Sequence, residues 1–292
     1  MHPPSCRGKW GKTIYPLHLL KEQFMTQTQW YEDWFDSPFY HKLYFERDDR
    51  EAEAFILKLA DHLQLKPNSR LVDVACGRGR HSKIFARLGL DVTGIDLSPA
   101  SIEYARQFER DNLHFFVHDM RLPFWGNYFE YAFNFFTSFG YFRTRREHDA
   151  AIRTISRSLK PGGFFVIDYL NVHYAEDHLV PAETKHLNGT VYDIKRWQDD
   201  SHFYKAIKVS DPSLAIPFEC TEKVAKFSLG DFTDMLSFQD MQVQEVFGNY
   251  QLDNYDVSKT PRLIVVARKA GNQPTDKEKR LYSDGRTTDA LT

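Results

Sequence analysis

The order of apolar and polar positions divides the chain into two parts with different periodicities. Between residues 50 and 170, short apolar runs alternate with segments in which apolar residues recur every three or four positions. Short apolar runs are typical of buried strands, and the wider spacing is typical of amphipathic helices. The pattern predicts strands at 71–75, 91–96, 113–117, 130–136 and 164–170, and helices at 50–63, 80–88, 100–110 and 148–159.

This alternation of strand and helix predicts a parallel sheet with helices on both faces. Local sequence signals mark the ends of several predicted helices. Ser98 is a favourable N-cap before Pro99, and Gly89 follows the helix predicted at 80–88. The segment 160–163 (Lys-Pro-Gly-Gly) predicts a loop that ends the last helix. We expect an α/β, Rossmann-like, doubly wound fold.

Beyond residue 180 the pattern changes to strict alternation of apolar and polar residues. The segments 191–197, 202–209 and 218–227 have this period of two, which is typical of antiparallel strands exposed on one face. The region 183–228 is therefore predicted to be a small antiparallel sheet inserted into the main fold. A helix at 230–238 and strands at 242–250 and 262–268 follow, which brings the main sheet to seven mostly parallel strands.

The two ends of the chain lack this periodicity. Residues 1–24 carry scattered Pro and Gly, and residues 271–292 are polar and rich in turn formers, so we expect both segments to be poorly ordered. Residues 25–270 are predicted to form one domain. The insertion at 183–228 is expected to cover a substrate site or to make a dimer contact.

Composition narrows the class of protein without naming a function. Lys plus Arg is 38 and Asp plus Glu is 40, a near-neutral balance that does not favour a nucleic-acid or membrane surface. The three cysteines are widely spaced, so we expect neither a disulfide framework nor a metal site, and a cytoplasmic location. No apolar run is long enough to span a bilayer, and no secretory signal is expected.

Two acids flank the glycine turn that follows the first predicted strand. Asp73 lies in that strand, four residues before Gly77, and Asp96 ends the next strand. In open α/β sheets ligands bind beyond the carboxyl ends of the strands, and an acid about 20 residues after the turn can reach ribose hydroxyls. A glycine turn also lets the backbone approach a ligand closely. The arrangement predicts a site for a nucleoside-bearing cofactor.

A nicotinamide dinucleotide is the obvious alternative cofactor. Its G-x-G-x-x-G fingerprint is incomplete here, because Ser82 stands at the last position. A carboxylate at Asp73 is also unfavourable beside a pyrophosphate and favourable beside a cation. A cationic cofactor is therefore the better interpretation.

These residues resemble the class I S-adenosylmethionine-dependent methyltransferases. The first motif of that family is an acid followed by alternate glycines, and here it is Asp73-Val74-Ala75-Cys76-Gly77-Arg78-Gly79, with Ala75 at a position that is often Gly. The resemblance implies that Asp96 holds the ribose, that Asp119 lies at the adenine, and that a tyrosine of an N-terminal lid meets the methionine carboxylate. The implied cofactor contacts are Asp73, Ala75, Cys76, Gly77, Gly79, Asp96, Leu97, Asp119, Met120, Phe136 and Tyr40.

The acceptor is less well defined by the sequence. His173 is the candidate general base, with an exposed loop histidine as the alternative, and the strand-four region around Phe136 is expected to face the methyl group. The Asn- or Asp-Pro-Pro signature of enzymes that methylate base amino groups or glutamine is absent. We expect methyl transfer to a small molecule by a monomer or homodimer. The alternatives are an RNA- or protein-directed methyltransferase and a non-catalytic nucleoside-binding module.

Overall fold

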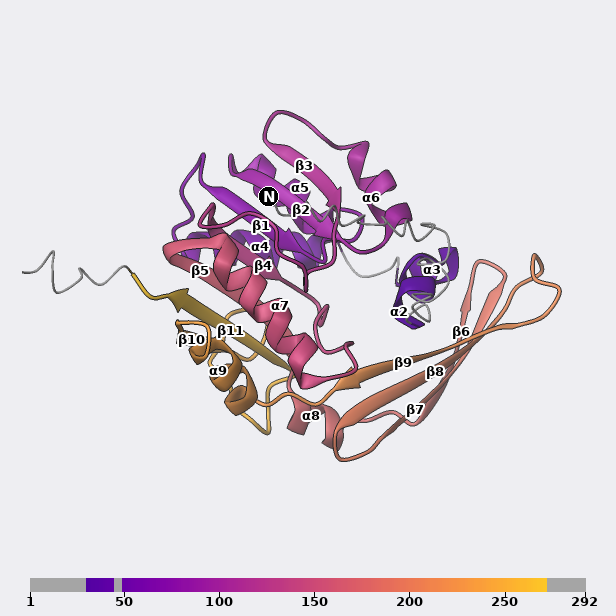
Figure 1. Ribbon diagram of the computed structural model, residues 1–292. Coiled ribbons are helices and arrows are strands. Elements are labelled where there is room, and N and C mark those ends of the chain that lie inside the picture. The colour runs from indigo at the N-terminus through magenta and orange to yellow at the C-terminus, as the bar shows by residue number, and fades with distance from the viewer. Residues whose placement is uncertain (1–29, 45–48, 272–292) are drawn as a thin grey trace, which may run out of the picture.

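The computed structural model describes residues 30–44 and 49–271. The segments predicted to be poorly ordered, 1–24 and nearly all of 271–292, lie outside the described residues. The described chain forms a seven-stranded sheet flanked by helices and a separate four-stranded sheet (Figure 1).

The seven-stranded sheet is parallel except at one side. Its strand order is β10-β11-β5-β4-β1-β2-β3, and β11 runs antiparallel to both β5 and β10. The order reverses between β1 and β4, so their carboxyl ends frame the switch point where ligands bind in open α/β sheets. The strands are β1 (Arg70–Val74), β2 (Asp91–Asp96), β3 (Leu113–Val117), β4 (Phe129–Asn134), β5 (Leu159–Leu170), β10 (Met241–Phe247) and β11 (Arg262–Lys269).

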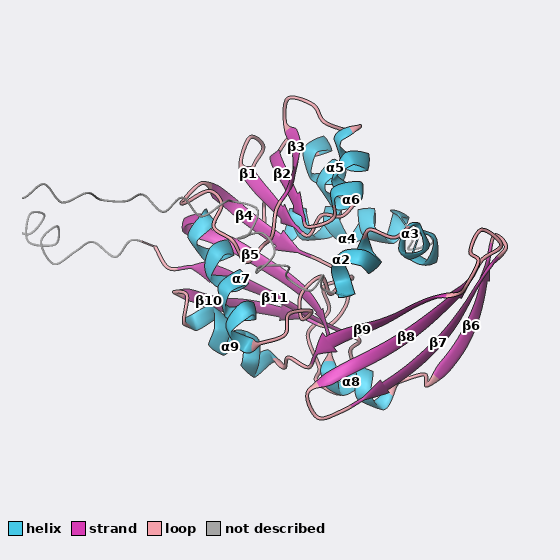
Figure 2. Cartoon of the chain, turned by 45° about the vertical axis from the view of Figure 1, so that its right-hand side comes forward, coloured by secondary structure: helices cyan, strands magenta, loops and turns pink. Residues whose placement is uncertain are grey.

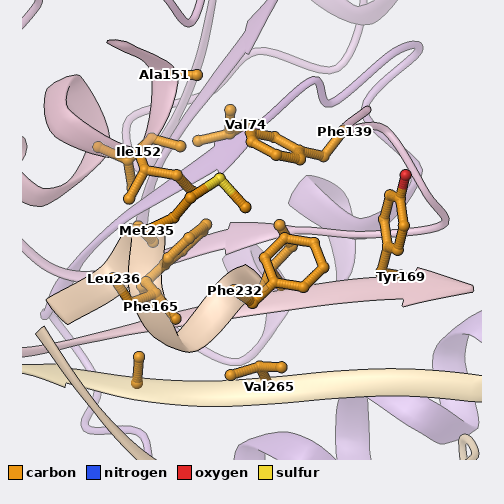
Figure 3. Packing of buried hydrophobic residues seen from close by; sticks show 14 of the residues in the cluster. Val74, Phe139, Ala151, Ile152, Phe165, Tyr169, Phe232, Met235, Leu236 and Val265 are labelled. Atoms are coloured by element: carbon orange, nitrogen blue, oxygen red, sulfur yellow. The ribbon is translucent and has the colours of Figure 1, made fainter. Parts of the chain in front are cut away.

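Helices cover both faces of this sheet, which confirms the predicted α/β fold. The apolar sides of α4, α5 and α6 pack into one cluster of buried residues, and those of α7 and α9 pack into another. Phe232 and Met235 of α9 lie over Phe165 and Val265 of the sheet (Figure 3). These helices are α4 (Asp49–His62), α5 (Arg80–Arg87), α6 (Pro99–Arg106), α7 (Arg145–Ser158) and α9 (Leu229–Ser237).

Local capping fixes where two of the helices begin. The Ser98 hydroxyl accepts a hydrogen bond from the Ser101 N–H, as its N-cap position predicts, although α6 ends four residues before the expected residue 110. Thr144 and Glu147 form a capping box, so α7 begins at Arg145 rather than at 148. Capping by Thr144 explains why the helix extends beyond its apolar pattern.

The segment 160–163 differs from its prediction as a loop, because it continues β5. Lys160 pairs with Glu130 of β4, and the Glu130 side chain also accepts the Arg70 N–H at 2.8 Å. Leu159 pairs with Phe129 and Phe164 pairs with Tyr131, so residues 160–163 lie opposite Glu130 alone and form a bulge within β5, with Gly162 at a φ of 79°. The short helix α8 (Val172–Asp177) was not predicted either.

The predicted insertion forms an antiparallel sheet in the order β6-β7-β8-β9. The alternation predicted three of its strands and missed the first, whose residues are mostly exposed. Figure 2 shows this sheet projecting from the main body, with α2 and α3 on its concave side. The elements are α2 (Trp30–Phe35), α3 (Pro38–Tyr44), β6 (Ala182–Leu187), β7 (Thr190–Gln198), β8 (His202–Ser210) and β9 (Phe218–Ala225).

Helices α2 and α3, here called the lid, are attached to the four-stranded sheet by apolar and polar contacts. Trp34 is fully buried and its ring stacks on Phe218 with centroids 5.9 Å apart. The Trp34 indole N–H donates to Glu222 at 2.7 Å, and the Tyr44 hydroxyl donates to the same carboxylate at 2.9 Å. The Tyr192 hydroxyl donates to the Phe39 carbonyl at 3.1 Å. The lid and this sheet therefore form one packed unit.

Replacing Trp34 with Ala tests this packing. The substitution should lower the free energy of unfolding by about 3–5 kcal/mol, because it leaves a cavity and removes one hydrogen bond to Glu222. Trp197 is the matched control, since its side chain stacks on Tyr204 at an exposed position, and Trp197→Ala should cost less than about 1 kcal/mol. Urea unfolding of both variants measures the difference, and equal losses would contradict the packing described.

Candidate functional site

The turn after β1 leaves open space above its first glycine. Ala75, Gly77 and Gly79 have φ values of 58°, 55° and 75°, in the left-handed region. A Cβ on Gly77 would meet nothing within 4 Å, whereas one on Gly79 would lie 2.5 Å from the Phe115 ring. Gly79 is thus needed for close packing at the start of α5, and Gly77 exposes the backbone to the space beyond the sheet.

Asp96 fastens this turn to the end of β2. One carboxylate oxygen accepts the Gly77 N–H at 2.8 Å, and the other accepts the Ser98 N–H at 2.8 Å. Burial raises the pKa of Asp96, and these two backbone hydrogen bonds oppose the rise. Each carboxylate oxygen has two lone pairs, so each can accept a further hydrogen bond. The carboxylate can therefore receive two neighbouring hydroxyls of a ligand.

Asp73 lies behind the turn and is almost fully buried, with 1 % of its surface exposed. Burial raises its pKa to about 7, although a hydrogen bond of 2.5 Å from the Ser82 hydroxyl lowers it. The nearby Asp96 charge adds to the rise, and burial with the two acids also raises the pKa of the Cys76 thiol. The two neighbouring acids favour positive charge in the space beside the turn.

The acid predicted at the adenine is held in an ion pair. The Arg121 guanidinium donates to both oxygens of Asp119, at 3.0 Å and 2.7 Å, and also donates to Glu147 at 2.9 Å. Thr154 donates to the Met120 carbonyl. Met120 and Leu97 pack against the apolar cluster that contains α7. These contacts fix the loop after β3, and no sequence pattern indicated the Asp119–Arg121–Glu147 network.

The exit of β4 brings aromatic rings towards the glycine turn. The Phe136 ring stacks on His81 of α5 with centroids 5.0 Å apart, and the Arg80 guanidinium lies 4.6 Å from its centroid. Phe133 is fully buried and Phe135 is 3 % exposed, as expected for core residues of a central strand. Phe136 is therefore joined to the residues that follow the turn, and its contact with the cofactor stays a prediction.

The lid reaches the same region from the other side. Asp36, between α2 and α3, accepts hydrogen bonds from the Ser98 hydroxyl at 2.6 Å and from the Ala100 N–H at 3.0 Å. Burial lowers the pKa of His41 to about 4, and the Arg78 charge adds to this. Asp36 therefore links the lid to α6 beside Asp96, and no sequence pattern indicated this contact between Asp36 and Ser98, which lie 62 positions apart.

Two further predicted site residues are Tyr40 of the lid and His173 of α8. Tyr40 packs within the lid, with its ring 4.8 Å from Tyr44 and 4.9 Å from Phe35, so Tyr40 and Tyr44 share a helix face. The side chain of His173 is 55 % exposed, and its ion-pair partner is Glu176 of the same helix at 3.8 Å. None of the contacts described for His173 joins it to Asp73, Asp96 or Phe136, so its role as a base stays a prediction.

Comparisons with known proteins show what this chain resembles. Residues 71–163 match the family model of a methyltransferase domain. A dTDP-3-amino-3,4,6-trideoxy-α-D-glucopyranose N,N-dimethyltransferase of Streptomyces venezuelae is 37 % identical over 101 residues, which are 34 % of this chain and 42 % of the relative. The matched region thus spans about two fifths of that relative's length.

Solved structures extend the likeness to the whole fold. An S-adenosylmethionine-dependent methyltransferase of Clostridium acetobutylicum has a TM-score of 0.68 at 16 % identity, covering 80 % of this chain and 97 % of its own. The amino pentose methyltransferase CalS10 of Micromonospora echinaspora has a TM-score of 0.57 at 19 % identity, covering 90 % and 100 %. The matched methyltransferase domain and the shared fold support the resemblance of the motif around Asp73 to the class I S-adenosylmethionine-dependent methyltransferases.

Proposed function

We propose that this protein transfers a methyl group from S-adenosylmethionine to a small-molecule acceptor. The observation that carries the proposal is a pair of acids, the buried Asp73 and the half-buried Asp96, on either side of a glycine turn that opens to space at Gly77. The pair fits a cationic nucleoside cofactor and does not fit a pyrophosphate.

The residues present can hold each part of that cofactor. Asp96 would accept the ribose hydroxyls through the lone pairs that Gly77 and Ser98 leave available. The loop of Asp119 and Met120 would contact the adenine, with Leu97 beside it. The cofactor would lie along the turn formed by Ala75, Cys76, Gly77 and Gly79. Its methionine end would be covered by Phe136 and Tyr40.

The cofactor supplies an electrophilic methyl group on sulfur, which an acceptor atom attacks as the carbon–sulfur bond breaks. The protein's contribution is to align the two reactants and to exclude water. The lid suits this role, because Asp36 fastens it to α6 and Glu222 fastens it to the four-stranded sheet. Among the described groups, His173 is retained as the candidate base for an acceptor that carries a proton.

A small acceptor is favoured over a polymer by the charges of α7. Arg145 could contribute to a basic surface for RNA, but it pairs with Asp149 at 3.1 Å and with Asp231 at 3.4 Å. The curated relative from Streptomyces venezuelae is named for an amino-sugar nucleotide. No helix within residues 30–44 and 49–271 is long and apolar enough to cross a membrane. The cytoplasmic location and the monomeric or dimeric state are part of this proposal.

Asp96→Ala tests the ribose contact. Loss of a charge-assisted hydrogen bond should weaken S-adenosylmethionine binding by about 1.5–3 kcal/mol, roughly 10- to 100-fold in Kd. Asp91→Ala is the matched control, because Asp91 begins the same strand and pairs with Arg70 at 3.8 Å far from the turn. Isothermal titration calorimetry compares the two variants. Unchanged affinity in Asp96→Ala would contradict the assignment.

The pKa of Asp73 gives a second test through pH. Its raised pKa means that the folded chain keeps a proton that the unfolded chain has lost between about pH 4 and 7, so this residue's contribution to stability falls as pH rises through that window. The slope is at most about 1.4 kcal/mol per pH unit. Asp73→Asn should therefore gain stability relative to the wild type as pH rises from 4.5 to 7.5, measured by urea unfolding.

Saturating S-adenosylmethionine should reduce this difference, because a bound cation favours the charged carboxylate. The uncharged product S-adenosylhomocysteine serves as the control and should reduce it less. A difference between Asp73→Asn and the wild type that stays constant with pH would show that Asp73 is not neutral in the folded chain.

A methyl-transfer screen identifies the acceptor. Radiolabelled S-adenosylmethionine is incubated with separate pools of small metabolites, including amino-sugar nucleotides, and with transfer RNA and protein extracts. The proposal predicts label in a small-molecule pool. Label confined to RNA or protein would overturn the small-molecule assignment and leave the cofactor assignment intact.

A further inference from the structure

Two consecutive residues at the exit of β4 have left-handed backbone conformations. Phe136 has a φ of 57° and Thr137 a φ of 59°, and neither is a glycine. Bulky and β-branched residues avoid this region, at a cost on the order of 1–3 kcal/mol each, and they persist there only where surrounding contacts hold them. The turn they form lies at the switch point, next to the residues that follow Gly77.

Asp168 of β5 holds this turn through both backbone N–H groups. Its carboxylate accepts the Phe136 N–H at 2.8 Å, and its backbone carbonyl accepts the Thr137 N–H at 3.0 Å. The Asp168 side chain is completely buried. A buried carboxylate that receives a backbone N–H fixes that peptide strongly, because neither group has water as a substitute partner.

Arg262 and Tyr250 hold Asp168 in turn. The Arg262 guanidinium lies 2.7 Å from one oxygen of Asp168, and it also donates to the Thr137 hydroxyl at 3.0 Å. The Tyr250 hydroxyl donates to the other Asp168 oxygen at 3.1 Å, and the Tyr250 ring packs on Phe136 with centroids 5.2 Å apart. Strands β5 and β11 and the segment after β10 thus converge on one strained turn of β4.

We propose that Asp168, Arg262 and Tyr250 are positioning residues, which hold Phe136 and Thr137 in the conformation that places the sulfonium end of the cofactor. The inference rests on the proposed function and deepens it. The three residues act through the turn and need not touch a ligand themselves. Strain at Phe136 and Thr137 is stored in the folded state, and the Asp168–Arg262 pair keeps the turn from relaxing.

This arrangement separates two halves of one site. The adenosine half depends on Asp96 and the loop after β3, which have no described contact with Asp168. The sulfonium half depends on the turn that Asp168 holds. Loosening the turn should therefore affect a ligand that extends past the ribose more than it affects adenosine.

The test uses Asp168→Asn in the full chain, with S-adenosylmethionine and adenosine as probes. Calorimetry should show S-adenosylmethionine binding weakened about tenfold or more, while an NMR titration shows adenosine affinity changed by less than about threefold. Amide hydrogen exchange of the peptide that contains Phe136 and Thr137 should become faster. Arg262→Lys keeps the charge and loses the forked contact to Asp168 and Thr137, so its effect should be intermediate.

Asn171→Ala is the matched control for stability. Asn171 is also fully buried at the end of β5, but its amide holds the carbonyls of Asp256, Val257 and Thr260 and does not contact the turn. Asn171→Ala should lower the melting temperature and leave the ratio of the affinities for S-adenosylmethionine and adenosine unchanged. If Asp168→Asn does not fold, Arg262→Lys and Tyr250→Phe carry the same comparison.

Three results would overturn the inference. One is equal weakening of both probes in the Asp168 and Arg262 variants, which would indicate a structural role alone. Another is faster exchange at Phe136 and Thr137 with both affinities unchanged, and the third is exchange that does not change. Failure of the wild type to bind either probe would instead refute the proposed function, and the exchange measurement would still report whether Asp168 holds the turn.

Discussion

The site depends on the cost of keeping two carboxylates out of water beside one glycine turn. Asp73 is buried and Asp96 is half-buried, and loss of contact with water raises the pKa of each. Hydrogen bonds offset part of this cost. The Ser82 hydroxyl donates to the Asp73 carboxylate, and the backbone N–H groups of Gly77 and Ser98 donate to the Asp96 carboxylate. A cation in the adjacent space relieves the remaining penalty. The same two acids thus explain the local hydrogen bonding and the charge of the ligand that the site favours.

The lid and the four-stranded sheet are connected to the region of that turn by a series of contacts. Asp36 brings the lid onto the start of α6, and Glu222 brings the four-stranded sheet onto the lid. The sheet is tied to the main body through Ala225, whose N–H donates to the Gly140 carbonyl at 2.8 Å and whose carbonyl accepts the Tyr169 hydroxyl at 2.5 Å. These contacts join the four-stranded sheet to the segment after β4 and to the carboxyl end of β5.

Periodicity predicted the strands of the main sheet and their mostly parallel arrangement, because buried strands need apolar runs. The start of α6 could also be predicted, because Ser98 caps the helix through Ser101, only three residues away. Distant pairs escaped prediction. Asp36 meets Ser98, and Asp168 meets Arg262 across 94 positions, and neither pair is encoded by local spacing. One signal for Asp168 was available, since it is a lone acid in the apolar run 164–170. Such an acid must find a buried partner, but sequence alone does not name it.

The central claim is that the pair Asp73 and Asp96 selects a cationic sulfur nucleoside. Calorimetric titration of the full chain with S-adenosylmethionine, with its demethylated product and with NAD measures that selection directly. The account predicts saturable binding of both sulfur nucleosides at one site and no binding of NAD. Binding of NAD in the absence of binding by either sulfur nucleoside would contradict it.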